Sequence, residues 1–285
     1  MSENQNRMQG KICLVTGATS GIGKATALKL AKLGATVVVM SRDKTKGEAT
    51  VRGIRETSDN PNVELLLCDL SSLASVRATA EEFKSRYGKL DILVNDAAVF
   101  VEKRMLTKDG LELMFATNHL GPFLLTNLLL PSFKEASRVI NLTAPSTVRP
   151  DFDDLQGERK FSAMNAFGAS KAANLLFTFA LARRLKERRI AANAYHPGIV
   201  KNTNLMRQAP PLMRVFGSFL NLFFGITPES AADGVVQLAS SKELEGISGE
   251  LIHKGKIIEA PFKKDIVAQD RLWSESAKLA GLGKR

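Results

Sequence analysis

The residues best suited to chemistry are a lysine and the ring four positions before it, in the stretch NAFGASKAAN at residues 165–174. Phe167 and Lys171 share one face of the helix that this stretch predicts, because residues four apart are neighbours on a helix. A hydroxyl beside the lysine would be a usable proton donor, whereas a phenyl ring has no proton to give. The stretch therefore leaves three interpretations: an enzyme that has lost its acid, an enzyme that needs none, or another kind of protein.

A second candidate site is the glycine-rich stretch TGATSGIG, residues 16–23, between an expected strand and an expected helix. Glycines let the backbone turn tightly and approach a pyrophosphate, and the helix that follows offers free N–H groups to the phosphate charge. This position in a β-α-β unit predicts a dinucleotide site. The residues assigned to it are Gly17, Thr19, Ser20, Gly21, Ile22 and Gly23.

The choice of dinucleotide depends on the residues that end the second expected strand, in VVVMSRDK. An acid there would bind the adenosine ribose and repel a 2′-phosphate. Ser41 and Arg42 occupy the decisive positions, and Arg42 can form a forked, charge-assisted contact with a 2′-phosphate. We therefore expect NADP(H), while Asp43, one residue later, keeps NAD(H) as the alternative.

The elements that must position these residues alternate along the whole chain. Continuous apolar strands separated by helices indicate an α/β fold, a Rossmann-type doubly wound parallel sheet of about seven strands with helices on both faces. The 285 residues show no linker or repeat, which predicts a single domain. The expected strands are 11–16, 36–41, 63–69, 91–95, 138–143, 190–197 and 248–253, and the expected helices are 23–34, 44–57, 75–88, 108–131, 162–188 and 228–240.

One long insertion, residues 202–226, is strongly apolar and follows the sixth expected strand. Ligands of doubly wound sheets bind at the carboxyl ends of the strands, so we expect this insertion to form a lid over a hydrophobic small-molecule substrate. Two alternatives stay open. The insertion could pack on the core or on a neighbouring subunit, or it could touch a membrane surface weakly.

Composition excludes several other classes of function. The net charge is +11, but the densest basic cluster, RRLKERR at 183–189, ends a long helix, where cations suit the helix dipole, and no nucleic-acid motif accompanies it. We therefore expect no nucleic-acid partner. Two cysteines and three scattered histidines predict no metal site. The polar first residues and the lack of any run near the ~18 apolar residues of a membrane span predict a cytoplasmic location.

Several motifs together resemble the short-chain dehydrogenase/reductase family. The spacing TGxxxGIG is similar to its glycine loop, and CDLSS (68–72), NDAA (95–98), NHLGPFLLT (118–126), FGASK (167–171) and HPGIV (196–200) resemble its other segments. Further detail resembles the retinol-dehydrogenase-like branch. The resemblance implies an oxidoreductase that pairs subunits, as a homodimer or homotetramer, through the helices at 108–131 and 162–188. It implies cofactor contacts from Asp69, Leu70, Asn95, Ala97, Lys171, Pro197, Gly198 and Thr203.

The departures from this family fall on its catalytic residues. In the family a serine polarises the substrate carbonyl, a tyrosine transfers the proton, and an asparagine, here Asn118, supports a water relay. This chain has Phe167 at the tyrosine position, and Ala144 falls where the serine is expected. Asp96 and Ala98 replace the second asparagine and the glycine of the family's N-N-A-G turn.

Four other residues are candidates for the missing proton donor. They are Thr143, Ser146, His119 and Asp96, and each also has an ordinary structural interpretation as a strand-end, turn or packed helix residue. Ser146 would qualify only if its loop folds back toward the helix. Asn202 falls where the family has a threonine near the carboxamide, so Thr203 would take that place after a shift of one residue.

Three functions therefore stay open on the sequence. The first is an NADP-dependent oxidoreductase with an atypical site, acting on an activated C=C bond or on a substrate protonated by another group. The second is a cofactor-binding regulatory or scaffolding protein without redox turnover. The third is non-redox chemistry, such as isomerisation or elimination, in the same pocket. Hydride consumption separates the first from the others.

Overall fold

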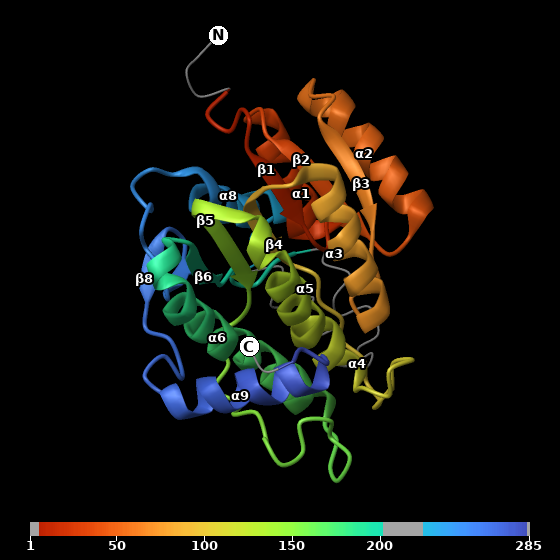
Figure 1. The fold of residues 1–285 in the computed structure, drawn as a ribbon, viewed down its shortest axis with the longest axis vertical. Coiled ribbons are helices and arrows are strands. Elements are labelled where there is room, and N and C mark those ends of the chain that lie inside the picture. Colours follow the sequence, from red (N-terminus) through yellow and green to blue (C-terminus); the bar gives the residue numbers. More distant parts are fainter. Residues whose placement is uncertain (1–5, 202–224, 284–285) are drawn as a thin grey trace.

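The computed structural model describes residues 6–201 and 225–283, which form a single α/β domain around one sheet (Figure 1). The strand order is β3-β2-β1-β4-β5-β6-β7-β8, parallel except for the antiparallel pair β7 and β8. The described residues thus hold eight strands, one more than the sequence predicted, because three mostly exposed residues form β8. The strands are β1 (Ile12–Val15), β2 (Thr36–Ser41), β3 (Val63–Leu67), β4 (Leu90–Asn95), β5 (Phe133–Leu142), β6 (Ala191–Tyr195), β7 (Leu251–His253) and β8 (Lys256–Ile258).

Helices cover both faces of this sheet, as the continuous apolar strands predicted. The core on one face joins the sheet to α3, α5 and α6, which lie in front of it in Figure 1, and the core on the other joins it to α1, α2 and α8. Val63 and Leu66 are fully buried, as a doubly covered sheet requires. The helices are α1 (Gly21–Lys32), α2 (Lys44–Ser58), α3 (Leu73–Tyr87), α4 (Leu113–Phe115), α5 (Gly121–Leu129), α6 (Ala163–Leu185), α8 (Pro228–Ser240) and α9 (Ile266–Leu279).

The strand order fixes where a ligand can bind. The chain runs outward from β1 to β2 and β3, then returns to place β4 on the other side of β1. At such a switch point the loops after β1 and β4 diverge and leave a crevice at the carboxyl ends of the strands. The loops after β5 and β6 end at the same edge, because these strands are parallel to β4.

The segment expected as one helix over 108–131 is less regular than predicted. The helix begins at Leu113, after Glu112 has capped it by accepting the Met114 and Phe115 N–H groups. A π-helical turn, Ala116–Leu120, then separates α4 from α5. Contrary to the expectation that no run nears the length of a membrane span, the stretch Leu113–Ser132 is long and apolar enough to cross a membrane by length and composition. In the fold 78% of that window is buried, as in a core helix.

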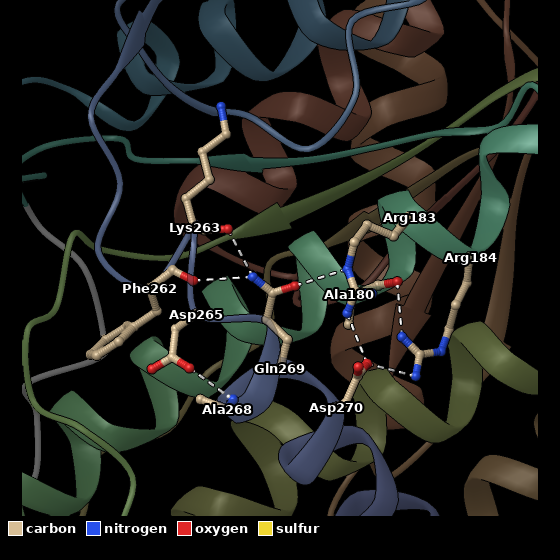
Figure 2. A network of polar contacts seen from close by, with 9 residues as sticks. All are labelled: Ala180, Arg183, Arg184, Phe262, Lys263, Asp265, Ala268, Gln269 and Asp270. Carbon is tan, nitrogen blue, oxygen red and sulfur yellow. Dashed lines mark hydrogen bonds and ion pairs between the residues drawn. The ribbon is translucent and has the colours of Figure 1, made fainter.

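Helix α9 lies against α6 and was not predicted from the sequence (Figure 2). Arg183 donates from Nε to the Gln269 side chain at 3.1 Å and from Nη2 to Asp270 at 2.8 Å. Arg184 donates to the same Asp270 carboxylate at 3.0 Å. Two arginines of the basic cluster at 183–189 therefore pair with α9 within the chain.

Aromatic side chains also join α9 to α5 and α6. The Trp273 ring packs edge-to-face with Phe123 of α5 at 5.1 Å and tilted against Phe177 of α6 at 5.9 Å between centroids, and Arg184 stacks over it at 4.2 Å. Helix α9 thus covers part of the surface of α5 and α6.

The apolar insertion expected as a lid lies almost wholly outside the described residues, and so do Asn202 and Thr203. Its two flanks are described. Val200 and Ile226 form a parallel β-bridge, with the Lys201 N–H donating to the Ile226 carbonyl at 2.9 Å. The insertion therefore begins and ends at one place, just beyond the end of β6.

Candidate active site

The glycine loop joins β1 to α1 and forms the cradle that the sequence predicted. Gly17 and Gly21 have φ angles of 66° and 52°, in the left-handed region that favours glycine. A Cβ atom at Gly23 would lie 2.6 Å from the Gly17 carbonyl oxygen, so only glycine allows this close turn. Ser20 caps α1 without a side-chain hydrogen bond, and the first helical turn holds no acid. The first N–H groups of α1 thus have no side-chain cap from Ser20, and Thr19 beside them is partly exposed.

The loop after β4 is tied directly to this cradle. The Thr16 hydroxyl accepts from the N–H groups of Asp96 and Ala97 at 3.0 and 3.1 Å. Asn95 was expected among the cofactor contacts, but its amide points into the core and donates to Asn141 at 2.8 Å and Thr126 at 3.3 Å. Its side chain therefore joins β4 to β5, and the backbone of the next residues lines the crevice.

At the end of β2, Asp43 has hydrogen-bond partners within the chain, whereas Arg42 has none among the described residues. Asp43 caps α2 by accepting the Lys46 N–H at 3.0 Å, and the buried Ser41 hydroxyl donates to the Asp43 carbonyl at 2.8 Å. Arg42 is exposed and has no hydrogen-bond or ion-pair partner among the described residues. A 2′-phosphate would therefore meet an unpaired guanidinium rather than a free carboxylate.

The expected adenine contacts follow β3. Asp69 accepts the N–H and the hydroxyl of Ser71 at 2.9 and 2.7 Å through one oxygen, Oδ1. Leu70 is buried, and its carbonyl oxygen would collide with a Cβ at Gly121. This close approach holds the loop after β3 against α5.

Phe167 and Lys171 lie together on α6, as their spacing predicted. The Lys171 Nζ atom is 5.4 Å from the centroid of the Phe167 ring, and the Phe167 and Phe100 rings pack edge-to-face with centroids 5.6 Å apart. Lys171 is only 8% exposed, and burial lowers its pKa to about 8 against the opposing charge of Asp96. The site thus keeps a buried amine that titrates near neutral pH, beside a ring without a hydroxyl.

Asn118 sits in the π-helical turn and connects three elements. Its side chain exchanges hydrogen bonds with the Val99 backbone at 2.7 and 3.0 Å and donates to the Ser170 hydroxyl at 3.1 Å. Ser170 in turn donates to the Phe167 carbonyl at 2.7 Å, and the Asn118 carbonyl accepts from Asn174 at 2.9 Å. π-turns are frequent at functional sites, and this one aims Asn118 between the β4 loop and α6.

Sequence reasoning missed Ser170 as the link between Asn118 and Phe167. Its spacing of three from Phe167 places it within hydrogen-bond reach of that carbonyl on a helix, which is the one signal that could have found it.

The loop after β5 carries the three residues considered for the serine role. Thr143 is buried, and its hydroxyl donates to the Lys171 carbonyl at 2.8 Å, so its proton is already engaged. Ala144 follows it, half-buried, with no group to polarise a carbonyl. Ser146 lies back against α6, with Oγ 3.3 Å from where a Cβ of Gly168 would stand. Ser146 therefore packs beside α6, where its hydroxyl accepts the Val148 N–H at 3.3 Å, and its role in place of the serine stays a prediction.

His119 is held away from the crevice. Its ring nitrogens contact Asn174 at 3.3 Å and, on α9, Ser276 at 2.8 Å. Burial lowers the pKa of His119 to about 4, so the ring is neutral near pH 7. The structure thus favours the interpretation of His119 as a packed helix residue.

The loop after β6 lies at the same end of the sheet as the glycine loop. His196 stacks on His253 at 4.8 Å between centroids, and the His253 Nδ1 lies 2.8 Å from the His196 carbonyl oxygen. Gly198 has a φ of 85°, which turns the chain sharply after Pro197. Both residues lie partly exposed at the same end of the sheet as the glycine loop.

An apolar surface lies around Phe167, which the sequence analysis did not identify. Phe100, Val101 and Met114 are buried there, and Phe161 packs against them. Three large apolar side chains of the described residues in the adjoining segments are about half exposed: Met105, Leu106 and Met164. A hydrophobic molecule would find apolar contacts on this side of α6.

Asp96 should destabilise the free protein as it ionises, so Asp96→Asn should be stabilising. Burial raises the pKa of Asp96 to about 7, above its unfolded value of 3.8. A raised acid pKa means that ionisation favours the unfolded chain, and the penalty grows between these two pH values and then levels off. The melting temperature of Asp96→Asn relative to the parent should therefore rise from pH 4 to pH 7 in thermal denaturation. A difference independent of pH would contradict the raised pKa of this carboxylate.

Comparison with known proteins agrees with this geometry. The family model described as short chain dehydrogenase matches residues 11–212. Human retinol dehydrogenase 14 is 39% identical, over 97% of this chain and 88% of its own length. A solved structure of a Mycobacterium paratuberculosis protein has a TM-score of 0.77 and 31% identity, over 96% of this chain and 94% of that one. A short chain dehydrogenase from Burkholderia cenocepacia J2315 in complex with NADP has a TM-score of 0.70 and 26% identity, over 87% of this chain and 97% of that one.

Proposed function

Because this chain belongs to the short-chain dehydrogenase family, we propose that it is an NADP(H)-dependent oxidoreductase that acts on a hydrophobic small molecule without a tyrosine acid. One observation carries the proposal: the cradle and Lys171 are intact, while the ring beside Lys171 is a phenyl group. The chain thus keeps the residues that fit the cofactor but lacks the tyrosine hydroxyl that would transfer a proton.

The cradle itself fits a dinucleotide. A Cβ at Gly17 would collide with the backbone of Ala97 and one at Gly23 with the Gly17 carbonyl, so the tight turn needs both glycines, and Ser20 gives the N–H groups of α1 no side-chain cap. When bound, the nicotinamide supplies or accepts the hydride. Arg42 would hold the 2′-phosphate, Asp69 the adenine amino group, and Lys171 the ribose. The Burkholderia structure, solved with NADP, supports this choice of cofactor by analogy.

The atypical acid–base chemistry follows from what the remaining side chains can do. Phe167 and Ala144 cannot donate a proton, Thr143 donates to the backbone, and neutral His119 faces α9. Ser146, beside Gly168, is the hydroxyl best placed among these candidates to reach a substrate. Substrates that need weak protonation, such as activated C=C bonds, suit this site better than simple ketones.

The proposed substrate is hydrophobic because the side of α6 that carries Phe167 is apolar. The name of the human relative, a retinol dehydrogenase, is consistent with such a substrate. We also propose a cytoplasmic location, which the burial of the Leu113–Ser132 helix supports. The homodimer or homotetramer stays a prediction, and a partner would have to bind the parts of α5 and α6 that α9 leaves open.

A cofactor-binding protein without turnover is the second candidate function. The same observation favours it, since a complete cradle beside Phe167 would bind the cofactor whether or not a hydride is ever transferred. NADPH oxidation with a panel of lipophilic aldehydes, ketones and enones separates the two functions.

Arg42→Ala should weaken NADPH binding by about tenfold or more and leave NADH binding unchanged. A charge-assisted phosphate contact contributes roughly 1.5–3 kcal/mol, which corresponds to at least tenfold in affinity. Calorimetric titration of both cofactors measures the effect, with Lys44→Ala as the control because Lys44 is a nearby exposed cation on α2. Equal affinities of the parent for NADPH and NADH would contradict the choice of cofactor.

A further inference from the structure

Asp96, directly after β4, directs a carboxylate into the glycine cradle that follows the neighbouring strand β1. Its backbone N–H donates to Thr16, which fixes the start of the β4 loop beside the end of β1. Its Oδ2 atom lies 2.7 Å from where a Cβ of Gly23 would stand and 3.2 Å from the corresponding point at Gly17. The Gly23 backbone N–H favours the charged form of this carboxylate and lowers its pKa. The acid therefore contacts both glycines that shape the anion site.

This position places a negative charge at the N-terminus of α1. That helix has no acid in its own first turn and no side-chain cap from Ser20, so Asp96 takes a place that would otherwise be open to an anion. A pyrophosphate needs the same N–H groups and the same positive end of the helix. Two anions at one site cannot both keep their full charge without a cost in free energy.

The groups that surround Asp96 bring its pKa close to neutral pH. Thr16 and Gly17 approach it from the β1 loop, Gly23 from α1 and Lys171 from α6. Among the described residues, Lys171 is the one charged group that shifts its pKa, and it lowers it. Burial outweighs both Lys171 and the Gly23 N–H and raises the pKa of Asp96 to about 7. Phosphate charge brought to the cradle would raise it further.

We propose that Asp96 takes up one proton when a dinucleotide enters the cradle, so that this side chain sets the pH range in which the cofactor binds. The inference rests on the dinucleotide site of the proposed function. The proton comes from solvent and adds to the carboxylate, and no other bond is made or broken. The neutral carboxyl then no longer repels the phosphates, and it can donate a hydrogen bond to one of them.

Calorimetric titration with NADPH between pH 6 and 9, in two buffers of different ionisation enthalpy, tests this proposal. The parent should lose affinity above pH 7, by up to about tenfold per pH unit as one proton becomes limiting, and should take up close to one proton at pH 8. Asp96→Asn should remove most of this slope and bind at least about tenfold tighter than the parent at pH 8. NADH is the control for the 2′-phosphate of NADPH, which can itself bind a proton in this pH range. Because Asp96 faces the pyrophosphate that both cofactors share, NADH affinity should fall with pH as steeply as NADPH affinity.

Two further variants locate the proton. Asp43→Asn changes another carboxylate near the cofactor but keeps a side chain that can cap α2, so its slope should equal the parent's. Lys171→Arg keeps the positive charge and cannot titrate in this range, and the slope should survive it. A slope lost in Lys171→Arg and kept in Asp96→Asn would place the proton on Lys171 and overturn the proposal.

The remaining outcomes separate this inference from the proposed function. NADPH binding of constant affinity from pH 6 to 9, without proton uptake, would overturn the role of Asp96 and leave the dinucleotide site standing. Failure of the folded parent to bind NADPH or NADH at any pH would overturn both.

Discussion

Phe167→Tyr combined with Ala144→Ser should raise the rate of aldehyde or ketone reduction by NADPH at least about tenfold over the parent. The Phe167 ring already lies 5.4 Å from the Lys171 ammonium group, so a tyrosine would add one hydroxyl to a ring in place. A placed proton donor contributes about 10² or more in rate, and carbonyl polarisation contributes a comparable factor. Steady-state NADPH oxidation from pH 6 to 10 measures the gain.

The two changes should act together. A hydroxyl that polarises the carbonyl is of little use without a donor, so the double variant should exceed the sum of the single variants in free energy. Phe161→Tyr is a matched control, because it adds a hydroxyl within the same apolar surface but on a ring outside α6. At saturating NADPH, only variants with Tyr at position 167 should show a pH step that is assignable to a tyrosine, at a pKa lowered by Lys171. A parent that reduces simple ketones as fast as the double variant would assign proton delivery to another group, such as Ser146.

Gly23→Ala should lower dinucleotide affinity on the order of 100-fold. The added Cβ would stand 2.6 Å from the Gly17 carbonyl oxygen and 2.8 Å from its carbon, and both are backbone atoms that cannot rotate away. The cradle must therefore open, and overpacking of this kind typically costs 1–3 kcal/mol. Fluorescence titration with NADPH measures the loss.

Gly53→Ala is the control for this glycine. Gly53 lies within α2, and a Cβ there would have no heavy atom within 4 Å. It should leave NADPH affinity unchanged and stabilise the fold slightly, since alanine favours a helix interior. Equal affinities of Gly23→Ala and the parent would show that the dinucleotide does not use this turn.

Most of the fold could be predicted from the sequence, because the patterns that indicate its strands, helices and glycine loop are local. The glycine loop stands between a buried strand and a helix, and both elements form around it as predicted. The parallel sheet followed from strands such as TVVVMS, whose continuous apolar pattern fits burial on both faces. Strand β8 has no such pattern, because it pairs through its backbone while its side chains stay largely exposed.

The parts that were missed depend on contacts between distant residues. His119 finds its partner Ser276 on α9, 157 positions along the chain, so no local pattern could show that its ring is engaged. The π-turn at Asn118 is equally hidden, because one extra residue in a helical turn leaves no mark in an apolar stretch. Asp96 was recognised as a departure from a family motif, but its contact with Gly23 appeared only when β1 and β4 were placed side by side.

The most direct test of the central claim follows deuterium from NADPH labelled on the nicotinamide C4 into a panel of lipophilic aldehydes, ketones and enones. A family member with an intact cradle and no tyrosine acid should transfer the label slowly to the enones and scarcely to the simple ketones, and the double variant should transfer it to the ketones. If the parent binds NADPH but the label stays on the cofactor in the parent and in the double variant alike, the chain is a cofactor-binding protein and the proposed oxidoreductase activity is wrong.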